Sequence, residues 1–255
     1  AGAEACAGCH DDQAATIANT VHGKTSRTTW GGASGCESCH GAGQRHIDEA
    51  DPSAITNLGE LKASEISDIC LNCHERGGRA NWKGSTHDHR GVSCIDCHDV
   101  HQEGVPNEAL LKVKADEQWR ACGGCHPSVR TAMMRNSHHP VREGVMSCGS
   151  CHNPHGSSGP SMLHQFSVNE QCYACHAEFR SPVAWEHPPV RENCLNCHNP
   201  HGSVNRPLLT NKQSRLCQQC HDEARHPTQP YDSAQDDYFF PVRRSMYNKA
   251  CVNCH

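Results

Sequence analysis

The feature that most constrains this chain is a five-residue motif, Cys-x-x-Cys-His, which occurs ten times in 255 residues. All twenty cysteines belong to these motifs, so none is left for another use. Two thiols three positions apart with a histidine directly after the second are the pattern of covalent haem attachment, in which the thiols bind the porphyrin and the histidine ligates the iron. The sequence therefore predicts ten covalently attached c-type haems.

The motif itself gives the residues predicted to hold these haems. The covalent attachment points are Cys6, Cys9, Cys36, Cys39, Cys70, Cys73, Cys94, Cys97, Cys122, Cys125, Cys148, Cys151, Cys172, Cys175, Cys194, Cys197, Cys217, Cys220, Cys251 and Cys254. The proximal iron ligands are His10, His40, His74, His98, His126, His152, His176, His198, His221 and His255. A zinc tetrathiolate, a disulfide framework or an iron–sulfur cluster would not require a histidine at the same place in every motif, so these alternatives are rejected.

The apolar content is too low for an ordinary hydrophobic core. Apolar residues make up 35% of the chain, and leaving out the twenty cysteines reduces this to about 27%, well below the usual range for a globular domain. Ten porphyrins would supply the missing apolar mass. The expected fold class is therefore a multihaem c-type cytochrome: an elongated chain, mostly loop with short α-helices and almost no sheet, around a core of ten stacked haems.

Odd-numbered and even-numbered motifs differ in the distance to the next histidine. After the first, third, fifth and seventh motifs a second histidine comes 12, 13, 12 and 11 residues beyond the motif histidine. After the first four even motifs a histidine comes at shorter range, in three cases only three residues later. We therefore expect a single elongated domain of five two-haem repeats. Their ranges are 6–46, 70–101, 122–155, 172–201 and 217–255.

The same spacing predicts the second axial ligand of each iron. Of the 22 histidines, twelve lie outside the motifs, nearly enough for two-histidine ligation throughout. Four that come after odd motifs are expected to return to the haem of their own motif, with a fifth, only five residues after its motif, added by analogy: His22, His87, His138, His187 and His226. Four that trail even motifs lie too close to their own macrocycle and are expected to ligate a neighbouring haem: His46, His101, His155 and His201.

One even-numbered haem lacks a distal ligand in this assignment. His89, His139 or His164 could supply it, or the natural chain could continue beyond His255. Short helices are predicted over residues 11–21 and 127–136, and capping boxes at Ser167-x-x-Glu170 and Thr210-x-x-Gln213.

Charge and hydropathy narrow the location and the partners. The net charge of −5 gives no reason to expect a nucleic-acid partner. No run of about 18 apolar residues predicts a membrane-spanning helix. Because haem is attached to such motifs outside the cytoplasmic membrane, we expect an exported protein whose first residue lies at or after a removed signal peptide.

Several segments carry a resemblance to a known family. They are the ten motifs, Cys36-x-x-Cys39-His40-Gly41 with His46, Ser137-His138-His139-Pro140, two Asn-Pro-His-Gly-Ser segments, Cys175-His176-Ala177-Glu178, Trp185-Glu186-His187 and Leu216-Cys217-Gln218-Gln219-Cys220-His221. Together they resemble the decahaem c-type cytochromes of the Mtr and Dms type, the haem-wire subunits of outer-membrane porin–cytochrome conduits.

The resemblance implies a function and partners. An elongated chain of ten bis-histidine haems would lie inside an outer-membrane β-barrel porin and pass electrons across the outer membrane. The other partners would be periplasmic or inner-membrane cytochromes on one side and an extracellular multihaem cytochrome or terminal reductase on the other. Two alternatives stay open: a soluble periplasmic electron shuttle, or a subunit of an extracellular cytochrome filament. A haem reductase is disfavoured because no motif ends in lysine.

Overall fold

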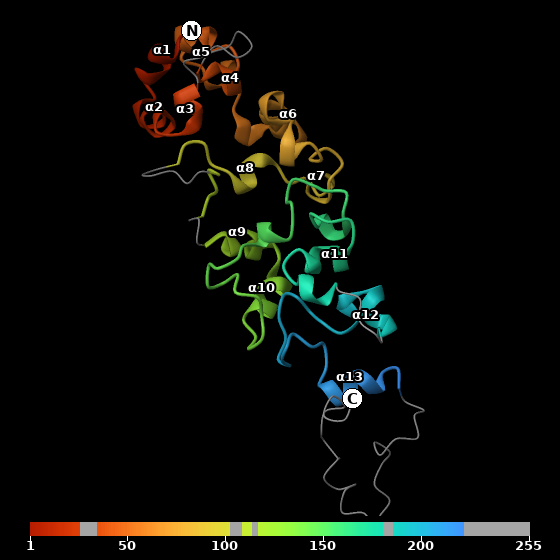
Figure 1. Cartoon of the computed structure of the whole chain (residues 1–255). Helices are drawn as coiled ribbons and strands as arrows, with labels where there is room; N and C mark the ends of the chain where they lie inside the picture. The colour runs from red at the N-terminus through yellow and green to blue at the C-terminus, as the bar shows by residue number, and fades with distance from the viewer. Residues whose placement is uncertain (26–34, 103–108, 114–116, 181–185, 222–255) are drawn as a thin grey trace, which may run out of the picture. The chain divides into compact units, whose positions relative to one another are not determined.

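The computed structural model describes residues 1–25, 35–102, 109–113, 117–180 and 186–221 (Figure 1). The chain forms two compact units. Unit 1 consists of Ala1–Cys125 and Ser147–Ser167, and unit 2 of His126–Met146 and Val168–His255. The sixth motif therefore folds with the first four, although the residues just before it belong to unit 2.

Unit 1 is built from short helices joined by loops. Its α-helices are α1 (Ala3–Ala7), α2 (Asp11–Ala18), α3 (Val21–Thr25), α4 (Glu37–His40), α5 (Gln44–Glu49), α6 (Ala63–His74), α7 (Thr86–His89), α8 (Cys94–Cys97) and α9 (Gln118–Cys125). Its 3₁₀-helices are η1 (Pro52–Ala54), η2 (Leu58–Glu60), η3 (Gly77–Arg79), η5 (Cys148–Ser150) and η6 (Pro160–Met162). Helix α6 begins where the backbone N–H of Lys62 donates to Glu65 Oε2 at 2.8 Å, which is half of a capping box.

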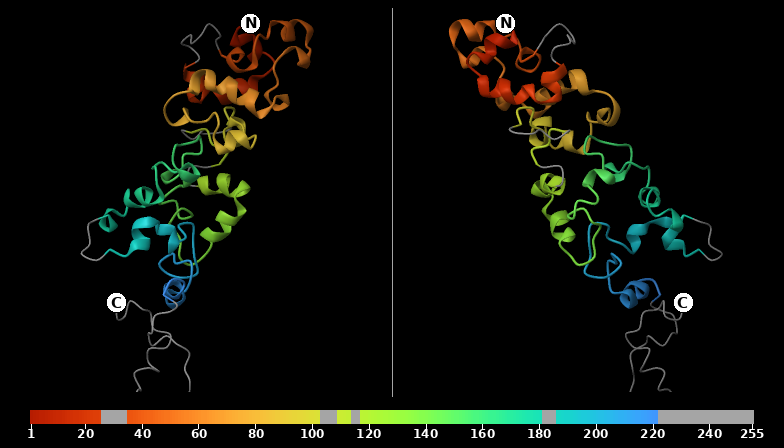
Figure 2. Two further views of the ribbon diagram at one scale, coloured as in Figure 1. Left: turned by 90° about the vertical axis from the view of Figure 1, so that its right-hand side faces the viewer. Right: turned by 60° about the vertical axis from the view of Figure 1, so that its left-hand side comes forward.

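Unit 2 has the same character. Its helices are α10 (Pro127–Met133), α11 (Val168–Tyr173), α12 (Pro188–Glu192), α13 (Gln213–Gln218), η7 (Ala177–Phe179) and η8 (Cys194–Asn196). Helices α10 and α12 each carry proline in their first turn, where the missing N–H has no helical partner to lose. Figure 2 shows these elements as separate short ribbons connected by loops.

The predicted helices form, with shifted ends. The helix after the first motif ends at Ala18 rather than at Val21, because the N–H groups of Asn19 and Thr20 bond three residues back and tighten the last turn. The helix after the fifth motif ends at Met133 rather than at residue 136. Helix α13 begins after Lys212, so the predicted capping box at Thr210 is wrong.

The part of the chain that the structure describes contains isolated β-bridges and no sheet, as expected. Three bridges have equivalent places: His98 with Leu111, His152 with Leu163, and His198 with Leu209. In each, a leucine 11 or 13 residues after a motif histidine pairs with that histidine. We call residues 152–163 the sixth-motif loop and residues 198–209 the eighth-motif loop.

Apolar burial is sparse within each unit. The buried apolar side chains in the described parts of unit 1 are Ile66, Trp82, Leu110 and Leu163. Those in unit 2 are Ala132, Met133, Val141 and Leu209. Leu163 and Leu209 are the residues that pair with the motif histidines in the two loops, so the little apolar burial that exists lies close to the motifs.

Candidate metal centres

Among the described residues, the motifs form single helical turns. The backbone N–H of the motif histidine donates to the carbonyl oxygen of the first cysteine at 2.9–3.0 Å in seven motifs, those of His10, His40, His98, His152, His176, His198 and His221. This is the i to i+4 bond of an α-helix. It places both thiols and the imidazole on one face, which is the arrangement that thioether attachment to one side of a porphyrin requires.

The thiols are available for attachment. No disulfide joins the described cysteines, and in the nine described pairs the first cysteine is half-buried, whereas the second is exposed in most of them. The first cysteines of consecutive motifs also meet. Cys70 and Cys122 donate hydrogen bonds to Cys94 and Cys148, which raises the pKa of each donor. The same bonds lower the pKa of Cys94 to about 6 and that of Cys148 to about 7.

The histidines meet in pairs. The ring centroids are 6.2 Å apart for His10 and His46, 5.8 Å for His22 and His74, 6.1 Å for His98 and His155, 6.3 Å for His139 and His176, and 6.1 Å for His187 and His221. Each pair joins one motif histidine with one histidine from outside the motifs. Among the described residues no group of three or more His, Cys, Asp or Glu side chains could hold a metal ion.

This spacing fits an iron held by two imidazoles. A metal–imidazole bond is about 2 Å long, so two such bonds in line separate the coordinating nitrogens by about 4 Å and the ring centres by somewhat more. A pair supplies two axial ligands and leaves the other positions of the metal to a porphyrin. The residues present therefore fit haem iron.

The hydrogen bonds of the rings identify the nitrogen that is left for the metal. In seven histidines Nδ1 lies 2.7–3.0 Å from a backbone carbonyl oxygen: His40, His46, His87, His98, His139, His152 and His198. Such a contact holds the proton on Nδ1 and directs Nε2 toward the metal. His101 Nδ1 makes a longer contact of the same kind, 3.2 Å from Gln13 O.

Burial keeps several paired histidines neutral, as metal binding requires. Desolvation lowers the pKa of His22 and of His74. Burial, with a smaller contribution from His98, lowers the pKa of His155 to about 4. The buried indole of Trp82 packs 6.3 Å from His155, and its Nε1–H has no hydrogen-bond partner among the described residues.

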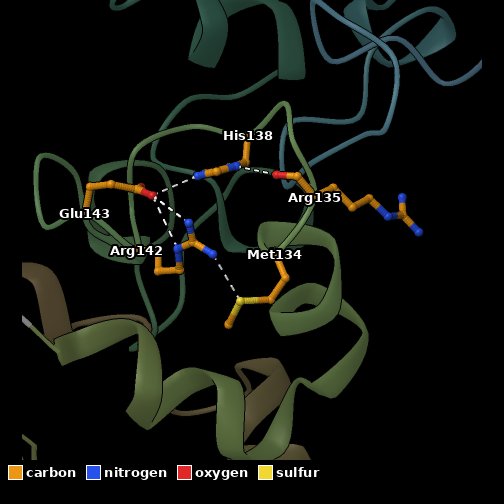
Figure 3. A network of polar contacts seen from close by, with 5 residues as sticks. All are labelled: Met134, Arg135, His138, Arg142 and Glu143. Carbon is orange, nitrogen blue, oxygen red and sulfur yellow. Dashed lines mark hydrogen bonds and ion pairs between the residues drawn. The ribbon is translucent and has the colours of Figure 1, made fainter.

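His138 has a different environment from the paired histidines (Figure 3). Its Nδ1 lies 2.6 Å from Arg135 O and its Nε2 3.0 Å from Glu143 Oε1. Glu143 also accepts from Arg142, so the ring belongs to a network of polar contacts. His164 likewise uses Nε2, at 2.9 Å from Gly149 O. In both residues Nε2 is therefore occupied and is not left for a metal.

The structure places the neighbouring His139, rather than His138, beside a motif histidine. His139 and His187 each stand directly before a proline, Pro140 and Pro188, and each faces a motif histidine. The prediction of His138 rested on its distance from His126 instead. The His-Pro step was the signal in the sequence that could have pointed to His139.

The structure also changes which motif each histidine faces. His22 lies beside His74 rather than His10, and His187 beside His221 rather than His176. In both cases the histidine lies beside the histidine of the next odd motif along the chain instead of that of its own motif. His46 and His155 lie beside the histidine of another motif.

Three further histidines, His87, His101 and His201, stay predictions as iron ligands. His226 and the tenth motif, with Cys251, Cys254 and His255, lie outside the described residues.

Comparisons with known proteins agree with this site. A family model described as a doubled CXXCH motif matches residues 87–131, 138–181 and 187–226, and each match contains an even motif and then an odd one. The chain is 38% identical over 266 aligned residues to the multihaem cytochrome MtrA of Shewanella baltica (strain OS185). The alignment covers 100% of this chain and 77% of that protein. This chain belongs to the MtrA-type multihaem cytochromes.

Membership of the MtrA-type family indicates the chemistry of this protein. The protein is a c-type multihaem cytochrome that transfers electrons, and its haems are bound covalently through the paired motifs. Its family points to an electron carrier of the periplasm or outer membrane rather than to an enzyme. In the described residues no helix has the length and hydrophobicity needed to cross a membrane.

Proposed function

We propose that this cytochrome binds ten c-type haems, one at each motif, and passes electrons along them with every iron held by two histidines. The observation that carries the proposal is the set of five imidazole pairs with ring centroids 5.8–6.3 Å apart. Two histidines close the iron to other ligands, and an iron closed in this way carries electrons without binding substrate.

The second histidines of the five pairs are proposed as the distal ligands of their partners. His46 then serves the first motif, His22 the third, His155 the fourth, His139 the seventh and His187 the ninth. In four of the five pairs, the motif that precedes the distal histidine and the motif whose iron it would ligate are two motifs apart along the chain. The exception is His46. The same separation of two motifs, applied within unit 1, assigns His101, which follows the fourth motif, to the iron of His40 in the second motif.

Within each unit, contacts between the thiols of different motifs support a path for electrons. Burial and the neighbouring Cys6 raise the pKa of Cys36, and burial and the neighbouring Cys73 raise that of Cys39. Within unit 2, Cys197 is similarly close to Cys220. Because each thiol is bonded to a porphyrin edge, neighbouring motifs bring neighbouring macrocycles together. Haem supplies the one-electron chemistry, and the chain sets the order and spacing.

The wider proposal is that this path crosses the outer membrane inside a β-barrel porin, between periplasmic or inner-membrane cytochromes and an extracellular multihaem cytochrome or terminal reductase. It is supported by the resemblance to haem-wire subunits and by the similarity of the whole chain to an MtrA cytochrome.

Haem content and ligation test the first proposal. The intact mass of the mature protein should correspond to ten covalently attached haems, and electron paramagnetic resonance (EPR) of the oxidised protein should show low-spin ferric iron. A count below ten would contradict the proposed stoichiometry, and a high-spin signal equal to several irons would contradict two-histidine ligation and favour a haem reductase.

Purification from native membranes tests the second. The protein should co-purify in detergent with an integral barrel protein, and the complex placed in a lipid vesicle should let an external reductant reduce an enclosed dye. A monodisperse monomer obtained without detergent would instead favour the soluble shuttle, and a polymer of this chain would favour the filament.

A further inference from the structure

The two Asn-Pro-His-Gly-Ser segments each contact one predicted iron ligand and contain another. The carbonyl oxygen of Pro154 lies 2.8 Å from Nδ1 of His87, and that of Pro200 lies 2.8 Å from Nδ1 of His139. The next residue in each segment is again a predicted ligand. In the first segment this residue is His155, whose ring centroid lies 6.1 Å from that of His98.

Each segment is held rigidly from within. The side-chain oxygen of Asn153 accepts the backbone N–H of His155 at 3.1 Å, and that of Asn199 accepts the N–H of His201 at 3.1 Å. The Ser157 hydroxyl donates to Leu163 O at 2.6 Å, and the Ser203 hydroxyl donates to Leu209 O. These bonds tie the segment to the part of the loop that returns beside its own motif histidine.

A glycine then lets each segment approach a preceding part of its own unit. Gly156 has φ +100°, and a Cβ atom there would lie 2.2 Å from Asn81 O. A Cβ atom at Gly202 would lie 2.1 Å from Ala132 O. Asn81 and Ala132 lie six and seven residues before His87 and His139. The close approach therefore brings the proline carbonyl to a histidine on the facing segment.

We propose that each Asn-Pro-His-Gly-Ser segment positions the axial ligands of two irons at once, which makes Asn153, Gly156, Asn199 and Gly202 positioning residues. The inference rests on the proposed two-histidine ligation. A carbonyl that accepts from Nδ1–H orients the imidazole and raises the basicity of the coordinating nitrogen. The peptide group that joins the proline to the next histidine is planar, so displacing the segment changes the surroundings of both irons together.

The test is Gly156→Ala in the full-length haem-loaded protein, with Gly91→Ala as its matched control. Both glycines have positive φ, +100° and +71°, but a Cβ atom at Gly91 meets nothing within 4 Å. The readouts are haem content, EPR of the low-spin ferric irons and a potentiometric titration. We expect unchanged haem content, altered low-spin signals equal to two irons per chain, and no alteration in the control.

Alteration of one iron only, of none, or of the same irons in the control would overturn the proposal. If Gly156→Ala does not fold, Asn153→Ala replaces it, because it loosens the segment without adding a Cβ clash, and the same two irons should change. The unmodified protein distinguishes a failure of the proposed function from a failure of this inference. If its covalent haem is absent or largely high-spin, the proposed function is contradicted. If the unmodified protein has ten low-spin haems and the variant alters only one iron, only the positioning of two irons by one segment is contradicted.

Discussion

The sixth-motif loop and the eighth-motif loop have the same internal design but different anchors. In both, Nδ1 of the motif histidine contacts a carbonyl nine residues later at 2.9 Å, and the N–H of the residue after it bonds the returning chain at 2.8 Å. Both contain Asn-Pro-His-Gly-Ser. What differs is how each loop is attached to the rest of its unit.

The eighth-motif loop is attached more extensively. Ser203 and Ser137 exchange two backbone hydrogen bonds of 2.7 and 3.0 Å. The Leu208 N–H donates to the Ser137 hydroxyl at 2.9 Å, and Arg135 donates to Gly202 O at 3.2 Å. The sixth-motif loop instead relies on Asn153 Nδ2, which donates to Gly78 O at 2.7 Å. Hydrogen bonds within each loop therefore give both loops the same geometry at the motif histidine. Hydrogen bonds to the rest of the unit determine how strongly each loop is attached, and these differ.

Removing the thiols of the sixth or the eighth motif should have the largest effect, the loss of a haem. The double substitutions Cys148→Ala with Cys151→Ala, and Cys194→Ala with Cys197→Ala, should each lower the haem content by one per chain, because each removes both thioether bonds of one porphyrin. Intact mass measures the haem content. An unchanged mass of bound haem in either variant would contradict attachment at that motif.

Replacing the histidine that the eighth-motif loop supports should change one iron. His139→Ala should convert one low-spin iron per chain to high spin, because Nε2 of His139 is the proposed ligand opposite His176. His138→Ala is the matched control and should leave every iron low-spin, because Nε2 of His138 contacts Glu143 and not a motif histidine. EPR spectroscopy measures both. The reverse result would restore His138 as the ligand.

The start of the eighth motif should be more sensitive than the start of the sixth. The side chain of Asn169, which is 8% exposed, donates to Val190 O and Arg191 O and accepts the N–H of Cys194, at 2.8–3.0 Å. Asn169→Ala should cost about 2–4 kcal/mol in chemical denaturation because it leaves buried groups unpaired. Ser150→Ala, which removes the 3.1 Å bond from Ser147 N–H and a 3.4 Å contact with the Ser147 hydroxyl, should cost about 0.5–1 kcal/mol.

Hydrogen exchange should separate the two loops in the unmodified protein. At about 1 kcal/mol per hydrogen bond, the extra bonds of the eighth-motif loop predict at least about tenfold slower amide exchange than in the sixth-motif loop. Mass spectrometry of peptides from the two loops measures the ratio. Equal exchange in both would show that haem, and not the anchors, holds them.

The two asparagines of the loops offer the finest comparison. Asn153→Ala removes the bonds to His155 N–H and Gly78 O and should cost about 1–3 kcal/mol. Asn199→Ala removes the bond to His201 N–H and should cost about 0.5–1.5 kcal/mol, because the Ser137 bridge remains. Denaturant unfolding of the two variants under the same conditions measures the difference. A larger loss for Asn199→Ala would contradict the difference in anchoring.

Much of the local structure was predictable because it depends on neighbouring residues. The helical turn of the motifs, the helix starts at Asp11 and Pro127, and the absence of sheet from the described residues all result from spacing and turn chemistry. Asn169 was missed as a positioning residue. Its partners lie 21 to 25 residues away and two of them are backbone carbonyls, which carry no signal in a sequence.

The sequence did not predict which motif histidine each second histidine faces. Spacing identified His22 and His187 as more than surface residues, but it placed them on the haems of their own motifs. The ring of His22 meets His74, 52 residues further along the chain. Nothing in an interval of 12 residues distinguishes a chain that returns from one that continues forward.

By itself, the sequence determined how haem is attached, because thioether bonds and the proximal histidine need only five consecutive residues in one helical turn. Only the tertiary structure decided which second histidine faces which motif, and that His139 rather than His138 does so. Those outcomes depend on long-range direction, on backbone carbonyls such as that of Pro200, and on which ring nitrogen each carbonyl or carboxylate occupies.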